Sequence, residues 1–170
     1  MEGFDPRTSF GYDESKRYDA VDTRGDQEET VAFLARLAGQ RDALEFAVGT
    51  GRIALPLTRA GVRVDGVELS QDMVDRMREK PDGNNVEVTM GDMSRVTTGR
   101  TYGLVYLVYN TIGNLLTQDN QPAPGPPARV RPHGPPRRPS VARKMGGWNG
   151  EPYTVTSWRH VSVYERLHDR

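Results

Sequence analysis

The chain has 170 residues, of which 35% are hydrophobic, and its 23 basic and 23 acidic residues give a formal net charge of zero. This length suits a single domain with a buried core, and the neutral balance gives no argument for nucleic acid or an anionic membrane as a partner. The absence of cysteine excludes disulfides and thiolate chemistry. Since the sequence has neither a signal-peptide pattern nor a long apolar run, we expect a cytoplasmic protein.

The first 120 residues alternate between helical and strand patterns. A helix is expected at 26–38, where Val31, Leu34 and Leu37 fall on one side after an acidic first turn. The elements that follow in chain order are a strand at 43–48, a helix at 52–60, a strand at 62–69, a helix at 70–80 and strands at 86–90 and 104–109. Pro56 suits the first turn of its helix, and Ser70 suits an N-cap.

This alternation predicts an α/β fold with a Rossmann-like parallel sheet and flanking helices. In sheets of this kind, ligands bind beyond the carboxyl ends of the strands, where the strand order switches direction. Residues that bind a ligand should therefore lie at strand ends or directly after them.

The first strand end carries a close pair of glycines, in the stretch ALEFAVGTGRIALPLTRAG at 43–61. Gly49 and Gly51 permit positive φ and let a ligand approach the backbone, although the pattern also suits a tight connection without a ligand. GTGRIA at 49–54 also fits the Gly-x-Gly-x-x-Ala pattern of NAD-binding turns. Glu45 argues against NAD, because its carboxylate would repel a pyrophosphate, and favours a ligand that carries an amino group.

Polar side chains follow the later strands as well. Glu68 ends the second strand, where an acid can accept hydrogen bonds from both hydroxyls of a ribose. Asp92 follows the third strand and could accept from an adenine amino group, while Tyr106 and Asn110 lie in the fourth strand or at its end. Each acid alone suits a solvated loop, but their joint placement favours a nucleoside ligand that lies across the strand ends.

These residues lie in stretches that resemble class I S-adenosylmethionine-dependent methyltransferases, and in particular a bacterial small-molecule methyltransferase subfamily. The stretches are LEFAVGTGRIALPL (44–57), VDGVELSQDMV (64–74), VTMGDM (88–93), LVYLVYNTIGNLLTQ (104–118) and the tail GGWNGEPYTVTSWRHVSVYER (146–166). The resemblance covers about residues 1–120 and 146–166, so part of the C-terminal half of the family is expected to be missing.

The resemblance implies S-adenosylmethionine as the cofactor and assigns the residues that would bind it. They are Glu45, Gly49, Gly51, Glu68, Leu69, Asp92, Met93, Tyr106 and Asn110. Glu45 and the two glycines would lie on the methionine side, and Glu68 would hold the ribose hydroxyls. Asp92 and Met93 would frame the adenine, and the two residues of the fourth strand would line the cofactor and acceptor side.

The implied reaction is direct transfer of the methyl group to a small-molecule acceptor, in which the protein mainly aligns a nucleophile with the methyl group. No metal is implied, and no residue is assigned as a catalytic base. His160 suits an exposed position on a strand, while Tyr12 or Tyr18 would cap the site from the N-terminal segment. An inactive cofactor-binding remnant and an NAD-binding module remain as alternatives, and the sequence leaves the acceptor and the oligomeric state open.

The chain departs from the family pattern at two positions near the site. Ala47 stands where the family usually has the first glycine of its turn, which is a mild change if φ there is negative. Gly103 replaces a common aspartate before the fourth strand.

A Pro/Arg-rich segment interrupts the resemblance. Between Gln121 and Lys144 lie eight of the 12 prolines and six basic residues, without an acidic one. Proline disfavours helix and central strand, so we expect residues 121–145 to be disordered and partly polyproline II, between a Rossmann-like region at 1–120 and a strand remnant at 146–170. The explanations are an arm that binds nucleic acid or a proline-recognising domain, a natural linker, or the product of a reading-frame shift in a GC-rich gene, which we favour.

The sheet is therefore expected to be incomplete after its fourth strand. That strand would have an open edge, which invites pairing with another chain. The tail strand around 159–165 is a candidate to add to this edge. Much of the acceptor pocket would still be missing, whereas the residues that bind the cofactor lie within 1–110.

Overall fold

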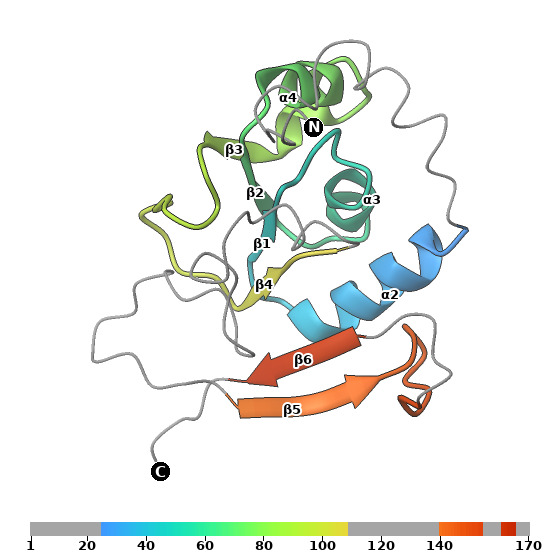
Figure 1. The fold of residues 1–170 in the computed structure, drawn as a ribbon. Coiled ribbons are helices and arrows are strands. Elements are labelled where there is room, and N and C mark those ends of the chain that lie inside the picture. The colour runs from blue at the N-terminus through green and yellow to red at the C-terminus, as the bar shows by residue number, and fades with distance from the viewer. Residues whose placement is uncertain (1–24, 109–139, 155–160, 166–170) are drawn as a thin grey trace, which may run out of the picture.

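The structure is a computed structural model that describes residues 25–108, 140–154 and 161–165 (Figure 1). Its elements are α2 Gln27–Ala38, β1 Ala43–Phe46, α3 Ala54–Arg59, β2 Val64–Glu68, α4 Gln71–Arg78, η1 Gly83–Asn85, β3 Glu87–Met90, β4 Leu104–Tyr106, β5 Ser140–Met145 and β6 Val161–Glu165. Up to β4 the helices and strands follow the order that the sequence predicts, with shorter strands and one additional 3₁₀ turn.

The central sheet has four parallel strands in the order β3-β2-β1-β4. Because β1 is followed by β2 on one side while β4 pairs with its other side, the strand order switches direction between β1 and β4. This arrangement confirms the predicted Rossmann-like α/β fold and locates the switch point, where such sheets bind their ligands.

The two faces of the sheet are covered in different ways. The helical layer, seen to the right of the sheet in Figure 1, contributes Phe33, Leu34 and Leu57 to the larger cluster of buried apolar residues. The opposite face carries a smaller cluster of Leu44, Phe46 and Val67, on which Met93, Val96 and Tyr102 of the β3–β4 connection pack. Each large apolar side chain that is fully buried contributes about 1.5–3 kcal/mol to folding.

Local signals explain where α3 and α4 begin. Ser70 is the N-cap of α4, and its hydroxyl accepts a hydrogen bond from the backbone N–H of Met73 at 3.4 Å. Pro56 lies in the first turn of α3, where its missing N–H has no helical partner. Met73, Val74 and Met77 then form the buried side of α4.

The strands β5 and β6 form a separate antiparallel sheet, as Figure 1 shows beside α2. The expectation that the tail strand adds to the edge of β4 is therefore wrong, because β6 pairs with β5 instead. Residues 140–145, which we had assigned to the Pro/Arg-rich segment, form β5. The last proline of that segment is at 139, so the residues of β5 keep the backbone N–H groups that a strand requires.

The loop after β5 attaches this small sheet to α2. Trp148 donates a hydrogen bond from its indole Nε1 to the Asp26 carboxylate, at 2.9 Å, and its ring lies 5.7 Å from the ring of Phe33. Asp26 is the N-cap residue of α2, but its side chain makes no capping hydrogen bond. The carboxylate at this N-cap position therefore binds the loop after β5 instead of capping its helix.

A charged network braces the amino-terminal end of the central sheet, opposite the strand ends that carry the site. Arg100 contacts Asp65 of β2 at 2.5 Å and Asp42, directly before β1, at 2.7 Å. Tyr102 also donates to Asp65, at 2.8 Å. The network ties the β3–β4 connection to two strands that lie far from it in the sequence.

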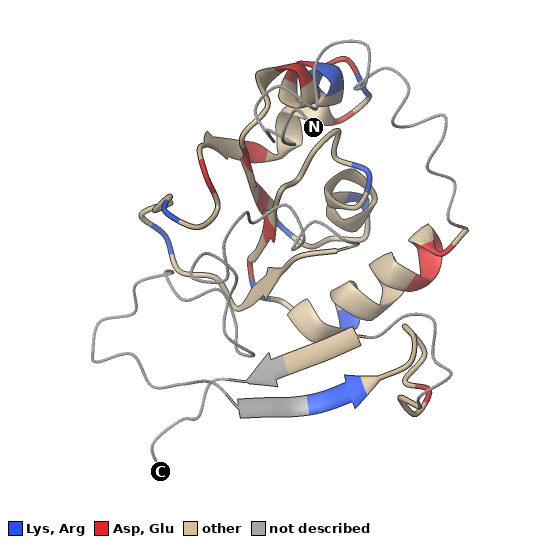
Figure 2. Ribbon diagram, viewed as in Figure 1, with Lys and Arg blue, Asp and Glu red and all other residues tan. Residues whose placement is uncertain are grey.

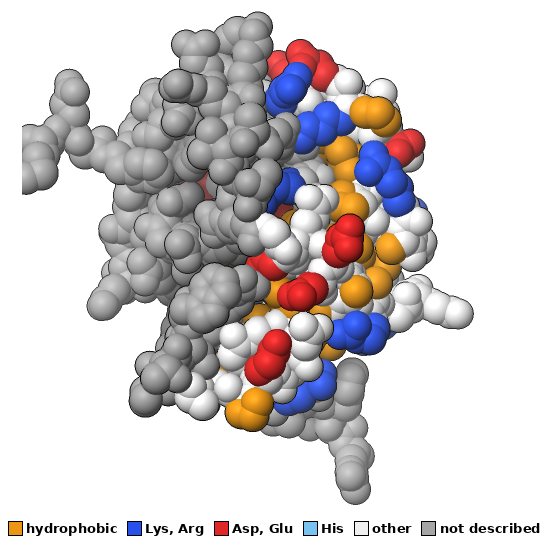
Figure 3. All heavy atoms as spheres, turned by 90° about the vertical axis from the view of Figure 1, so that its right-hand side faces the viewer, with side chains coloured by type: hydrophobic (Ala, Val, Ile, Leu, Met, Phe, Trp, Pro, Cys, Tyr) orange, Lys and Arg blue, Asp and Glu red, His pale blue; other side chains and the backbone are white. Residues whose placement is uncertain are grey.

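The charges on the described surface are mixed in sign. Figure 2 shows basic and acidic positions distributed over the same helices, and Figure 3 shows both signs beside apolar side chains on one face. Among the described residues, no helix combines the length and the apolar character that crossing a membrane requires.

Candidate cofactor-binding site

The predicted site residues of three strands meet at the carboxyl end of the sheet. Glu45 of β1 has Gly66 of β2 and Tyr106 of β4 as its register partners, so the side chains of Glu45 and Tyr106 lie next to each other. Glu68 is the last residue of β2. The backbone N–H of Gly91, directly before Asp92, bonds to the Glu68 carbonyl at 2.8 Å, which brings the end of β3 to the same place.

The two turn glycines have different roles. Gly49 has a φ of 56°, and among the described residues a Cβ there would meet only the Ala47 carbonyl oxygen, at 3.9 Å. Gly51 has a φ of 75°, and a Cβ there would lie 2.6 Å from the Met77 sulfur and 2.9 Å from Cγ of Leu55. Gly51 is therefore required by the packing of α4 and α3 against the turn, whereas no such side chain of the described residues fills the space beside Gly49.

Ala47 adopts a φ of 52°, so the condition under which alanine would be a mild change is not met. The turn demands a left-handed conformation at the position where the family usually has glycine. An alanine in this conformation costs roughly 1–2 kcal/mol, because its Cβ approaches the following carbonyl oxygen.

Replacement of the alanine, Ala47→Gly, is expected to stabilise the chain by up to about 1 kcal/mol, because relief of the strain exceeds the added entropy of the unfolded state. Urea denaturation measures this change. The matched control is Ala60→Gly, at an exposed position with a φ of −77°, which should destabilise the chain by about 0.5–1 kcal/mol. A loss of stability in both variants would contradict the strain at Ala47.

The Glu68 carboxylate is held by three backbone N–H groups. Its Oε2 accepts from Gly49 at 2.8 Å, and its Oε1 accepts from Leu69 at 2.9 Å and from Ser70 at 3.0 Å. An ionised carboxylate has about four acceptor positions, so roughly one remains for another donor. Glu68 thus joins β2 to the glycine turn, and Leu69 takes part through its backbone.

Glu45 and Tyr106 form a buried pair. Tyr106 donates its hydroxyl to Glu45 Oε2 at 3.0 Å, and both residues are buried. Burial raises the pKa of the Glu45 carboxyl to about 8, although the hydrogen bond from Tyr106 and the charge of Arg52 oppose this rise. Burial also raises the pKa of Tyr106 well above its ordinary value. At neutral pH the pair is therefore largely neutral, and a positive charge beside it would favour the carboxylate.

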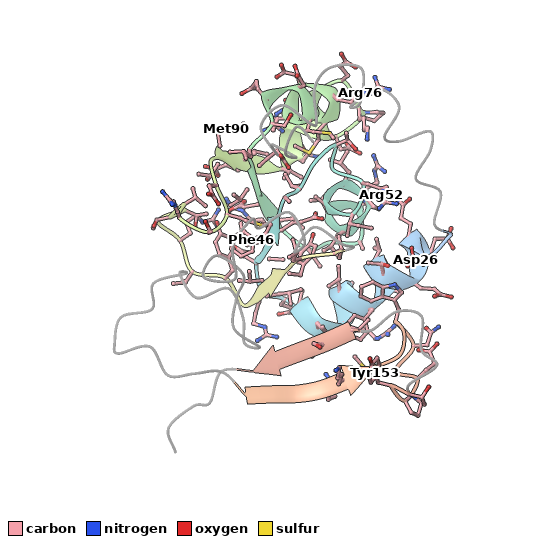
Figure 4. All side chains as sticks on the ribbon, viewed as in Figure 1. Asp26, Phe46, Arg52, Arg76, Met90 and Tyr153 are labelled. Carbon is pink, nitrogen blue, oxygen red and sulfur yellow. The ribbon has the colours of Figure 1, made fainter. Side chains whose placement is uncertain are left out.

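Arg52 is a part of the site that our sequence reasoning did not assign. It directly follows Gly51, and its charge acts on Glu45. The backbone carbonyl of Arg52 accepts a hydrogen bond from Gln27 of α2 at 3.1 Å, and Figure 4 shows the residue beside α3. A cation directly after a Gly-x-Gly turn was the signal that could have identified it, since a carboxylate-bearing ligand needs such a partner.

Asp92 and Met93 begin the connection that follows β3. Asp92 Oδ1 accepts from the backbone N–H and the hydroxyl of Ser94, at 2.8 and 2.7 Å, which stabilises the turn there. Met93 is half-buried and packs on the smaller apolar cluster. Asn110 lies outside the described residues, as do Tyr12, Tyr18, His160 and residues 109–139.

A family model described as a methyltransferase domain matches residues 43–123. The match contains the glycine turn, Glu68, Asp92 and Tyr106. No curated protein matched the chain. This match and the strand order of the sheet agree with the resemblance of the chain to class I S-adenosylmethionine-dependent methyltransferases.

Solved structures share the fold at low sequence identity. The CcbJ methyltransferase of Streptomyces caelestis is 23% identical, with a TM-score of 0.79 over 97% of this chain and 100% of that one. A TehB-like S-adenosylmethionine-dependent methyltransferase of Corynebacterium glutamicum is 17% identical, with a TM-score of 0.69 over 92% and 100% of the two chains. The sugar N-methyltransferase KedS8 of Streptoalloteichus is 23% identical, with a TM-score of 0.55 over 71% of this chain and 48% of that one.

Proposed function

We propose that the chain binds S-adenosylmethionine at the carboxyl ends of β1, β2 and β3 and transfers its methyl group to a small molecule. The observation that carries this proposal is the turn around Gly49, which among the described residues has room beside its Cα and is bound by the Glu68 carboxylate from the next strand. We further propose that the protein is cytoplasmic and that neither nucleic acid nor a membrane is its partner.

The chemistry of the described side chains fits the parts of this cofactor. The remaining acceptor position of Glu68 suits a ribose hydroxyl, and the carboxyl of Glu45 suits the ammonium group of the methionine part. Arg52 suits the carboxylate of that part. Asp92 offers an acceptor for the adenine amino group, and Met93 an apolar contact for the ring.

When bound, the cofactor supplies an electrophilic methyl group on a positively charged sulfur. The protein's task is to hold the acceptor in line with that group and to keep water away from it. Tyr106, buried beside Glu45, keeps this carboxyl in place through its hydroxyl. We assign no catalytic base, because none of the described site residues is free of a role in holding the turn or the cofactor.

Two alternatives lead to different outcomes of one experiment. An NAD-binding module would place a pyrophosphate beside the turn, where the buried Glu45 offers no positive charge to bind it and would repel it once ionised. A remnant without turnover would bind the cofactor and its product but transfer no methyl group.

Titration calorimetry with S-adenosylhomocysteine tests the proposal, with NADH as the competing ligand. We expect saturable binding that is weakened at least about tenfold in Glu68→Ala, because a charge-assisted hydrogen bond and a contact of the turn are lost. The control Glu79→Ala removes an exposed acid directly after α4 and should bind as the wild type does. Binding of NADH in place of S-adenosylhomocysteine, or of neither ligand by a folded chain, would overturn the proposal.

Turnover is measured separately, with radiolabelled S-adenosylmethionine and a panel of small amines, alcohols and amino sugars. Transfer of label to any of these would identify the class of acceptor. Binding without transfer over the whole panel would favour the inactive remnant.

A further inference from the structure

The end of α4 contacts the glycine turn at two points. The Met77 side chain occupies the space that a Cβ at Gly51 would need. Lys80, two residues beyond the last residue of α4, donates a hydrogen bond from Nζ to the carbonyl oxygen of Thr50, at 2.8 Å and across 30 positions of sequence. Thr50 is fully buried and lies between the two turn glycines.

The side chain of Lys80 contacts the turn after β1 and not the last carbonyl groups of its own helix. A lysine in this position commonly interacts with the last carbonyl groups of the helix that carries it. Here the half-buried side chain reaches the turn after β1 instead, while its backbone N–H bonds to the Met77 carbonyl at 3.0 Å. Its contact with the turn is therefore a tertiary one.

Two side chains of opposite charge hold the turn through hydrogen bonds to two of its peptide groups. The Glu68 carboxylate accepts from the N–H of Gly49, and the Lys80 ammonium donates to the carbonyl of Thr50. The peptide group that joins Gly49 to Thr50 lies between these two bonded groups. Because positive φ values recur at Ala47, Gly49 and Gly51, the isolated backbone has little preference for this one conformation.

We propose that Lys80 is a positioning residue for the cofactor, which fixes the glycine turn through the Thr50 carbonyl in the conformation that binds the ligand. This inference rests on the proposed function and assigns a role in that site to a residue that does not touch the ligand. The Lys80 side chain acts together with that of Glu68, because the two bind on either side of the peptide group that joins Gly49 to Thr50.

The test compares Lys80→Met, which keeps the aliphatic stem and removes the donor, with Lys80→Arg, which keeps a donor. We expect Lys80→Met to bind S-adenosylhomocysteine about tenfold more weakly, and Lys80→Arg to remain within about threefold of the wild type. Hydrogen exchange of the ligand-free chain should become faster at residues 48–53 in Lys80→Met. The control Arg63→Met removes an exposed positive charge before β2 and should change neither measurement.

The outcomes separate this inference from the proposed function. A lysine with a structural role alone would lower the unfolding midpoint of Lys80→Met and leave the affinity of the folded chain unchanged, which overturns the inference. Exchange at 48–53 that matches the wild type also overturns it. If the wild-type chain itself fails to bind S-adenosylhomocysteine, the proposed function fails, and the positioning role fails with it.

Discussion

The substitution Glu45→Gln should stabilise the chain relative to the wild type as the pH rises. The folded chain holds the Glu45 proton with a pKa of about 8, against an ordinary value of 4.5. Between these two values the folded state binds more protons than the unfolded state, so the wild type loses stability as the pH rises through this window. The loss over the whole window is on the order of 5 kcal/mol, of which about 3 kcal/mol falls above pH 5.5, and a neutral glutamine does not share it.

Urea denaturation of both proteins at pH 5.5, 7 and 9 measures this effect as a difference, in which the other titrating groups cancel. The variant Glu79→Gln serves as the control, because an exposed acid should give a difference that stays flat with pH. A flat difference for Glu45→Gln would show that the carboxyl is already ionised in the folded chain.

The same carboxyl should link cofactor binding to pH. Because a bound ammonium group favours the ionised form of Glu45, the wild type should bind S-adenosylhomocysteine more tightly at pH 8 than at pH 6. Glu45→Gln should lose this dependence. Calorimetry at the two pH values measures both, and an equal pH dependence in the two proteins would exclude contact of Glu45 with the positive charge.

The substitution Arg100→Met should destabilise the chain by about 3 kcal/mol, because it leaves the carboxylate of Asp65 buried without its cation. The Asp65 side chain is 7% exposed and lies 2.5 Å from Arg100. Urea denaturation at pH 7 measures the loss. The control Arg59→Met breaks the exposed pair with Asp82 and should cost about 0.5 kcal/mol.

A second variant distinguishes the loss of the ion pair from the loss of packing around Arg100. Addition of Asp65→Asn to Arg100→Met removes the unpaired charge and should restore a large part of the lost stability. If the double variant is as unstable as the sum of the two single variants, the side chains act independently and the ion pair does not brace the sheet.

The parts of the structure that depend on local pattern were predictable from the sequence. The spacing of apolar residues gave the helix that became α2, and the Ser70 N-cap gave the start of α4. The proximity of Glu45 and Glu68 was predictable because the carboxyl ends of parallel strands meet at one edge of the sheet.

The parts that depend on distant contacts were not predictable. Nothing near Lys80 in the sequence indicates its bond to Thr50, and nothing near Arg100 indicates its contact with Asp42, across 58 positions. The sequence left the sign of φ at Ala47 open, because alanine prefers negative φ while the surrounding turn determines the angle. The pairing of β6 with β5 was missed because composition assigned residues 140–145 to the proline-rich segment.

The β3–β4 connection gives cofactor binding a further physical consequence. Met93, Val96 and Tyr102 of this connection cover one apolar face of the sheet, and Asp92 at its start lies beside the proposed adenine position. When this segment opens, buried apolar surface meets water and a wall of the site is lost in the same event. A ligand that occupies the site makes that opening rarer in proportion to its concentration. The segment therefore acts as a local folding unit, and the protection of its backbone amides against hydrogen exchange should rise with the concentration of the cofactor.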